Sequence, residues 1–294
     1  MLTHDELELF RRQGWVLLPG FLAADLTELT AELGRVFPSN EQYWAEPDKF
    51  PQLRGGQFDS VRTIPTGIPR LDLLPFQERF RSIAEQLTGS ADLRIMRGGY
   101  QAKFTDAADF GQILHLDYTN HTLVVLPEGD ASTMVGFFAY FSEVTKDTGP
   151  TMVVSHEHTR HVADTHLRRE EWADVYAHEE PLLCGPGTLL VYDYRTFHRG
   201  SALTGARARR VTLSFAYGVA APWHGFYSWP NRADEPDVGR LIAWLSPRER
   251  SLIGFPRPGD DYWTAETIEA VARRYPGFDG MPYLSAGRSS GQPR

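Results

Sequence analysis

The stretch Gln112–Thr122, QILHLDYTNHT, contains a histidine and an aspartate separated by one leucine. The apolar residues around His115 and Asp117 predict a β-strand over Gln112–Asp117. Because residues i and i+2 of a strand point to the same face, the imidazole and the carboxylate are expected on one wall. A histidine and a carboxylate are two of the three ligands in the two-histidine-one-carboxylate face that binds non-haem iron(II).

A later segment of the chain offers the third ligand. Gly187–Tyr192 is predicted to be a buried strand, and His198 follows shortly after it. The next predicted strand starts with Arg209 and Arg210, and Arg209 lies eleven residues after His198. A hairpin of this length can return an arginine to its histidine, and a guanidinium can bind a carboxylate through two hydrogen bonds. One of the two arginines is expected to bind an anion, and the other to be exposed.

Composition narrows the class of protein. The 294 residues carry a net charge of −8 and no Lys/Arg block, which argues against nucleic acid or an anionic membrane as a partner. No apolar run approaches the roughly 20 residues that a membrane span needs. Cys184 is the one cysteine, so no disulfide can form within the chain. With an N-terminus that lacks a basic-then-apolar leader, this predicts a cytoplasmic protein.

The order of predicted elements indicates a mainly β fold with flanking helices. Thr3 and Glu6 have capping-box spacing and predict a first helix ending at Gly14. From Leu93 onward, short apolar strands alternate with turns, which is typical of a sandwich or barrel. No linker divides the chain. We therefore expect a single domain over 1–294, with a helical and irregular part at 1–92, a β core at 93–219 and a C-terminal arm at 220–294.

These motifs together resemble the phytanoyl-CoA dioxygenase family of iron(II)/2-oxoglutarate oxygenases. The likeness covers most of the chain and rests on Leu2–Leu29, the H-x-D at 115–117, Asp147–Arg160, Gly185–Ser201 and Arg209. Two features depart from the family pattern. Arg199 is an added residue where glycine is usual, and the usual Pro-Gly before His156 is missing.

The resemblance implies a double-stranded β-helix, also called a jelly roll or cupin-like fold. It implies that His115, Asp117 and His198 bind Fe(II). It further implies that Arg209 binds the distal carboxylate of 2-oxoglutarate and that O2 is the oxidant. Such an enzyme releases succinate and CO2 while it hydroxylates a small organic substrate. Gln101 is expected near 2-oxoglutarate, as in related hydroxylases.

The outcome of the reaction and the substrate are less constrained. Halogenating relatives lack the carboxylate ligand, so Asp117 favours hydroxylation, although desaturation and ring formation remain open. Tyr118, Trp223 and Trp229 are candidates for substrate contacts or for aromatic packing. The substrate classes considered are a free acid, an acyl-CoA and a natural-product intermediate. Both a monomer and a homodimer remain possible.

Two other functions are compatible with parts of the sequence. One is a non-catalytic jelly-roll protein that binds a small molecule, which the four intact residues His115, Asp117, His198 and Arg209 argue against. The other is a cupin-type zinc or manganese hydrolase or isomerase using His156 and His158. No glutamate follows those histidines at the expected spacing, so the oxygenase is the preferred hypothesis.

Overall fold

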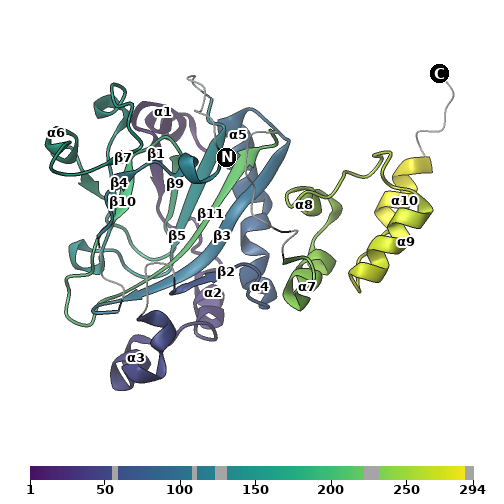
Figure 1. Ribbon diagram of the computed structural model, residues 1–294, viewed down its shortest axis with the longest axis horizontal. Coiled ribbons are helices and arrows are strands. Elements are labelled where there is room, and N and C mark those ends of the chain that lie inside the picture. The colour runs from purple at the N-terminus through teal and green to yellow at the C-terminus, as the bar shows by residue number, and fades with distance from the viewer. Residues whose placement is uncertain (55–58, 108–110, 123–130, 222–228, 230–231, 289–294) are drawn as a thin grey trace.

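The computed structural model describes residues 1–54, 59–107, 111–122, 131–221, 229 and 232–288. Most of these residues belong to two antiparallel β-sheets and the helices around them (Figure 1). In the described part of the chain, none of the helices combines the length and apolar composition required to cross a membrane.

The larger sheet has six strands in the order β1-β9-β5-β11-β3-β2. Their bounds are β1 Trp15–Leu18, β9 Leu189–Asp193, β5 Met134–Tyr140, β11 Arg209–Val219, β3 Leu93–Phe104 and β2 Val61–Thr63. The smaller sheet has five strands in the order β7-β4-β10-β6-β8. Their bounds are β7 His166–Leu167, β4 Leu114–His115, β10 His198–Gly200, β6 Thr151–Val153 and β8 Glu180–Pro181.

The path of the chain explains the pairing. From β3 to β6 the strands fall alternately in the larger and the smaller sheet, and β9 to β11 do the same, so sequence-distant strands become neighbours. This alternation between two antiparallel sheets is the pattern expected of a jelly roll. The predicted mainly β fold with flanking helices is confirmed.

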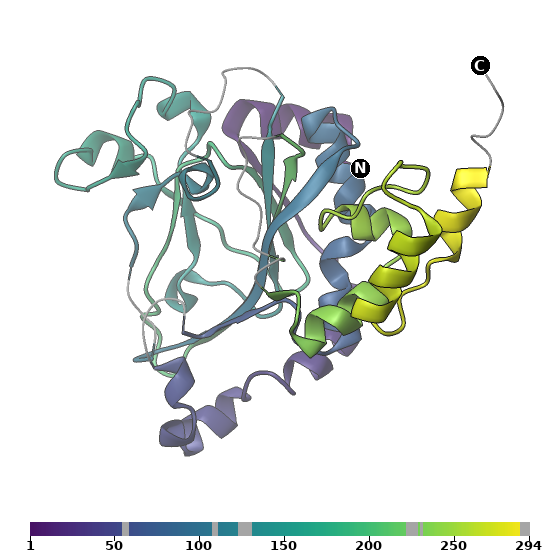
Figure 2. The ribbon, with the colours of Figure 1, turned by 45° about the vertical axis from the view of Figure 1, so that its right-hand side comes forward.

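Helices cover the outer face of the larger sheet (Figures 1 and 2). On β11, Val211, Leu213, Phe215 and Tyr217 alternate with residues of the opposite face and join the main hydrophobic core. Phe80 of α5 packs edge-on against Phe215. The helices are α1 His4–Gln13, α2 Leu26–Leu33, α3 Asn40–Ala45, α4 Pro69–Asp72, α5 Glu78–Thr88, α6 Ala173–Tyr176, α7 Pro236–Trp244, α8 Pro247–Ser251, α9 Ala265–Arg274 and α10 Met281–Arg288.

Both ends of the described part of the chain are helical. The predicted capping box of Thr3 and Glu6 is present, and α1 ends before Gly14, whose φ of 91° is left-handed. α7 lies beside α4, and α9 and α10 lie farther out (Figures 1 and 2). These C-terminal helices contain a separate cluster of buried residues that includes Ile242, Trp263 and Tyr283.

The strand predicted over Gln112–Asp117 is shorter in the structure. β4 comprises only Leu114 and His115, and Asp117 begins a 3-10 turn over Asp117–Asn120. The turn follows because Leu116, with φ −106° and ψ 128°, is the last extended residue. Asp117 still reaches the wall that carries His115, so the error concerns the element and leaves the grouping of side chains intact.

Candidate metal centre

Two histidines from distant parts of the chain are cross-strand neighbours. β4 and β10 pair antiparallel, with His115 directly opposite His198. Their ring centroids are 4.7 Å apart. Asp117 completes the group, and one ligand atom from each of the three residues lies within 4.8 Å of the other two.

Backbone carbonyls orient both imidazoles. Nδ1 of His115 lies 2.9 Å from the carbonyl oxygen of Ile113, and Nδ1 of His198 lies 3.0 Å from that of Thr196. A carbonyl can only accept a hydrogen bond, so Nδ1 carries the proton in each neutral ring and Nε2 is left with a free lone pair. Both Nε2 atoms face Asp117, at 3.6 Å from Oδ1 and 3.5 Å from Oδ2. This is the tautomer that metal-binding histidines require.

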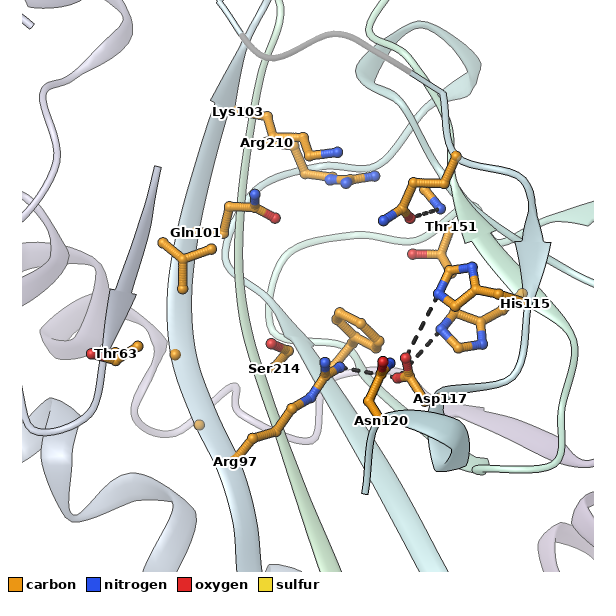
Figure 3. A pocket seen from close by; sticks show the side chains of 17 residues that line it. Thr63, Arg97, Gln101, Lys103, His115, Asp117, Asn120, Thr151, Arg210 and Ser214 are labelled. Atoms are coloured by element: carbon orange, nitrogen blue, oxygen red, sulfur yellow. Dashed lines mark hydrogen bonds and ion pairs between the residues drawn. The ribbon is translucent and has the colours of Figure 1, made fainter. Parts of the chain in front are cut away.

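Asp117 is a buried carboxylate with cationic neighbours. Its burial opposes ionisation, but Arg97 and His198 beside it hold the pKa of Asp117 well below its usual value. Nη2 of Arg97 donates to Oδ2 at 3.1 Å (Figure 3). The site therefore presents two imidazole nitrogens and one ionised oxygen on one wall, which is a donor set suited to iron(II).

The three residues line a cavity of about 240 Å³ between the two sheets. Figure 3 shows cationic side chains at two levels of this cavity, with Arg97 beside Asp117 and the Lys103–Arg210 pair farther away. The remaining walls combine polar side chains with apolar ones such as Phe138, and the polar ones include Thr63, Gln112, Asn120, Thr151 and Ser214. The cavity is thus suited to a small ligand with anionic groups.

Arg210, and not Arg209, lies in this cavity. Arg210 is 6% exposed, and its Nη1 has no hydrogen-bond partner among the described residues. It pairs across strands with Lys103, whose pKa is lowered to about 7 by burial and, to a smaller extent, by Arg210. A buried guanidinium with an unused N–H is suited to bind a ligand carboxylate.

Arg209 lies on the opposite face of β11. It lines a separate hollow with Leu33 and Phe37 on the helix-covered side, and its guanidinium lies 5.6 Å from the ring centroid of Phe104. This differs from the expectation that Arg209 binds 2-oxoglutarate. The cause is the strand period of two, because moving one position along a strand exchanges its faces.

The other predicted site residues have different positions. Gln101 lines the cavity, and its Nε2 donates to Ser60 Oγ at 3.1 Å. Tyr118 does not line the cavity and packs, half-buried, against two hydrophobic clusters. Trp229 is buried in the main core, which matches the packing interpretation. Trp223 lies outside the described residues.

The histidines of the alternative hydrolase site do not form a metal cluster. Nε2 of His156 lies 3.1 Å from the hydroxyl of Thr196, and His158 stacks on His178 with ring centroids 3.8 Å apart. Among the described residues, His115, Asp117 and His198 are the one group of histidine, cysteine, aspartate or glutamate side chains arranged to hold a metal.

Comparison with known proteins agrees with this geometry. Residues 10–211 match the family described as phytanoyl-CoA dioxygenase (PhyH). The chain belongs to this family. None of the curated proteins matches the sequence. The predicted resemblance is therefore confirmed over more than half of the length of this PhyH-family protein.

Solved structures with a similar fold are distant in sequence. HygX from Streptomyces hygroscopicus, solved with iron bound, is 16% identical, with a TM-score of 0.54 over 75% of this chain and 88% of that one. The epimerase SnoN, in complex with Fe3+, alpha ketoglutarate and nogalamycin RO, is 19% identical, with a TM-score of 0.54 over 74% and 83%. EctD from S. alaskensis is 17% identical, with a TM-score of 0.55 over 78% and 82%. At these identities the likeness shows a shared fold.

Sequence reasoning missed three residues of the cavity and its surroundings. Lys103 and Arg97 share a face of β3 with Gln101, two and four residues away, so the alternation of that strand was a usable signal. Tyr192, whose hydroxyl donates to Asp117 Oδ2 at 2.6 Å, gave no such signal. It lies 75 residues after Asp117 in sequence, and only the packing of the two sheets brings them together.

Proposed function

We propose that this PhyH-family protein is an Fe(II)- and 2-oxoglutarate-dependent dioxygenase that hydroxylates a small organic substrate. His115, Asp117 and His198 would bind iron(II), and Arg210 would bind the distal carboxylate of 2-oxoglutarate. The observation that carries the proposal is the pair of imidazoles with Nε2 free, converging on an ionised carboxylate in a cavity that also holds a buried arginine.

The residues of the site have defined parts in the proposed reaction. Iron(II) held by His115, Asp117 and His198 would supply, with 2-oxoglutarate and O2, the oxidant, with succinate and CO2 as the co-products. Carbonyl groups of Ile113 and Thr196 hold the two imidazoles in the metal-binding tautomer. The guanidinium of Arg210, with the neighbouring Lys103, attracts the anionic co-substrate and fixes its direction in the cavity.

The substrate proposed is a small molecule with at least one polar or anionic group. Besides the two histidines, the ionisable side chains that line the cavity are Arg97, Lys103 and Arg210, which are positive when protonated, and the carboxylate of Asp117. Among fold neighbours, HygX was solved with hygromycin B and SnoN with nogalamycin RO. Those complexes, together with the polar walls here, favour a free acid or a natural-product intermediate over a purely apolar substrate.

Hydroxylation is the preferred outcome because Asp117 keeps the carboxylate ligand in place. The neighbours SnoN and SnoK are an epimerase and a carbocyclase, so ring closure and epimerisation are competing outcomes for the same type of centre.

A cytoplasmic location remains a prediction from the single cysteine. The choice between monomer and homodimer remains open, and sedimentation of the purified protein would decide it.

The test is anaerobic addition of 2-oxoglutarate to the iron(II)-loaded protein, followed by exposure to O2 and measurement of succinate. We expect a weak visible charge-transfer band on chelation, and slow succinate formation that needs both iron and 2-oxoglutarate. His198→Ala should abolish both signals. A band and a rate equal to wild type in this variant would refute the assignment of the metal ligands.

A further inference from the structure

One oxygen of Asp117 carries two donors and the other carries none. Tyr192 of β9 donates its hydroxyl to Oδ2 at 2.6 Å, and Arg97 of β3 donates Nη2 to the same oxygen at 3.1 Å. Among the described residues, no donor lies within 3.5 Å of Oδ1, whose near neighbour is Nε2 of His115 at 3.6 Å, and Nε2 of His198 lies 3.5 Å from Oδ2. The carboxylate is therefore held by one end.

The aromatic ring of Tyr192 packs directly against the backbone of Gly136, and this packing fixes where its hydroxyl points. Gly136 of β5 lies opposite Tyr192 in the larger sheet. A Cβ added at Gly136 would lie 2.2 Å from Cε1 and 2.7 Å from the hydroxyl oxygen of Tyr192. On other sides the ring meets Phe138, with centroids 5.6 Å apart, and His198, at 5.0 Å. The absent side chain at position 136 is thus what allows the phenol to lie against the strand and reach Asp117.

The carboxylate fixes the direction of this contact. An ionised carboxylate has acceptor oxygens only, so the hydroxyl of Tyr192 is the donor and Oδ2 of Asp117 is the acceptor.

We propose that Tyr192, seated against Gly136, acts with Arg97 as a positioning residue that keeps Asp117 a one-oxygen metal ligand. This inference rests on the proposed function, because it assumes that a metal ion binds to Asp117. A carboxylate that bound through both oxygens would occupy a further coordination position. Two positions are needed for 2-oxoglutarate and one for O2, and a facial triad leaves just these open. Engaging Oδ2 with two donors leaves Oδ1 as the oxygen available to the metal.

Burial by itself does not explain the contact. Tyr194, two residues farther along and also fully buried, has a hydroxyl with no hydrogen-bond partner among the described residues. Its ring centroid lies 5.5 Å from that of Tyr192. The fold therefore tolerates a buried phenol without an acceptor at this place, and Tyr194→Phe is a matched control that removes a hydroxyl of the same kind.

The experiment compares Tyr192→Phe, Tyr194→Phe and wild type, each loaded with Co(II), which has visible absorption bands that depend on coordination number. Circular dichroism and thermal melting first check that each variant is folded. We expect Tyr192→Phe to change the Co(II) spectrum and to weaken Co(II) binding by about 10- to 100-fold, the usual effect of losing a partner of a metal ligand. Tyr194→Phe should match wild type.

The other outcomes separate the explanations. A Tyr192→Phe protein with the wild-type spectrum and a Kd within about twofold of wild type would overturn the inference. An equal change in Tyr194→Phe would also overturn it, because the cause would then be general packing. A wild-type protein that binds no Co(II) would instead refute the proposed function. If Tyr192→Phe fails to fold, Gly136→Ala, which displaces the ring, is expected to give the same altered spectrum.

Discussion

The choice between two adjacent arginines is the sharpest prediction from the structure. Arg210→Met should greatly weaken 2-oxoglutarate binding, and Arg209→Met should leave it unchanged. Methionine keeps most of the aliphatic stem and removes the charge and the N–H donors. The two variants change the same residue type at neighbouring positions of β11, so they differ only in the face of the strand that is altered.

The size of the effect follows from burial. Arg210 is 6% exposed, so a carboxylate bound to it is largely shielded from water. Truncating one partner of a buried, hydrogen-bonded charge pair costs about 2–5 kcal/mol. This corresponds to a Kd about 30-fold to a few thousand-fold higher. Lys103 lies across the strand and keeps part of the attraction, so we expect the lower half of this range.

The assay is the anaerobic titration of each iron(II)-loaded variant with 2-oxoglutarate, using the charge-transfer band to obtain Kd. Iron binding is measured separately, because both variants should keep the metal. Loss of the band in Arg209→Met with wild-type affinity in Arg210→Met would refute the assignment and restore the expectation from the eleven-residue spacing. Equal affinity in both variants would show that neither arginine anchors the co-substrate.

Three further perturbations test other parts of the molecule. The Kd for 2-oxoglutarate should rise as the pH increases through about 7, because Lys103 loses its positive charge in this range and a bound carboxylate favours the charged form. Calorimetry measures this pH profile, and Lys103→Met should flatten it. Glu179→Gln should lower the free energy of unfolding by about 2–3 kcal/mol in urea denaturation, because Arg199 loses the anion that its Nε contacts at 2.5 Å, and the exposed Glu180→Gln should have little effect. Thr3→Ala should cost about 1 kcal/mol by removing the N-cap of α1, and an unchanged urea midpoint would contradict this.

Much of the fold was predictable because local patterns and the tertiary structure agree. The β core begins at Leu93, as predicted, with the long strand β3, and most of the apolar residues of this strand are buried. The segments that were predicted less well are short. β4 has two residues and β7 has two, and elements of this length carry too little periodicity to be read from sequence.

The sequence by itself identified the candidate metal ligands. The one-residue spacing keeps His115 and Asp117 close along the backbone, and Asp117 reaches the wall of His115 from the start of a 3-10 turn. A distal histidine was recognisable at His198 from the apolar strand before it and from the family pattern. These inferences depend on residue type and on local spacing, and both can be read directly from the sequence.

Only the tertiary structure decided what surrounds the ligands. It placed Arg210 in the cavity and Arg209 on the helix-covered side, because neighbouring residues of a strand point to opposite faces. It also brought Tyr192 and Arg97 to the same oxygen of Asp117, across 75 and 20 residues of sequence. Such contacts depend on the register and spacing of two packed sheets, to which every strand contributes, and no local stretch of sequence specifies them.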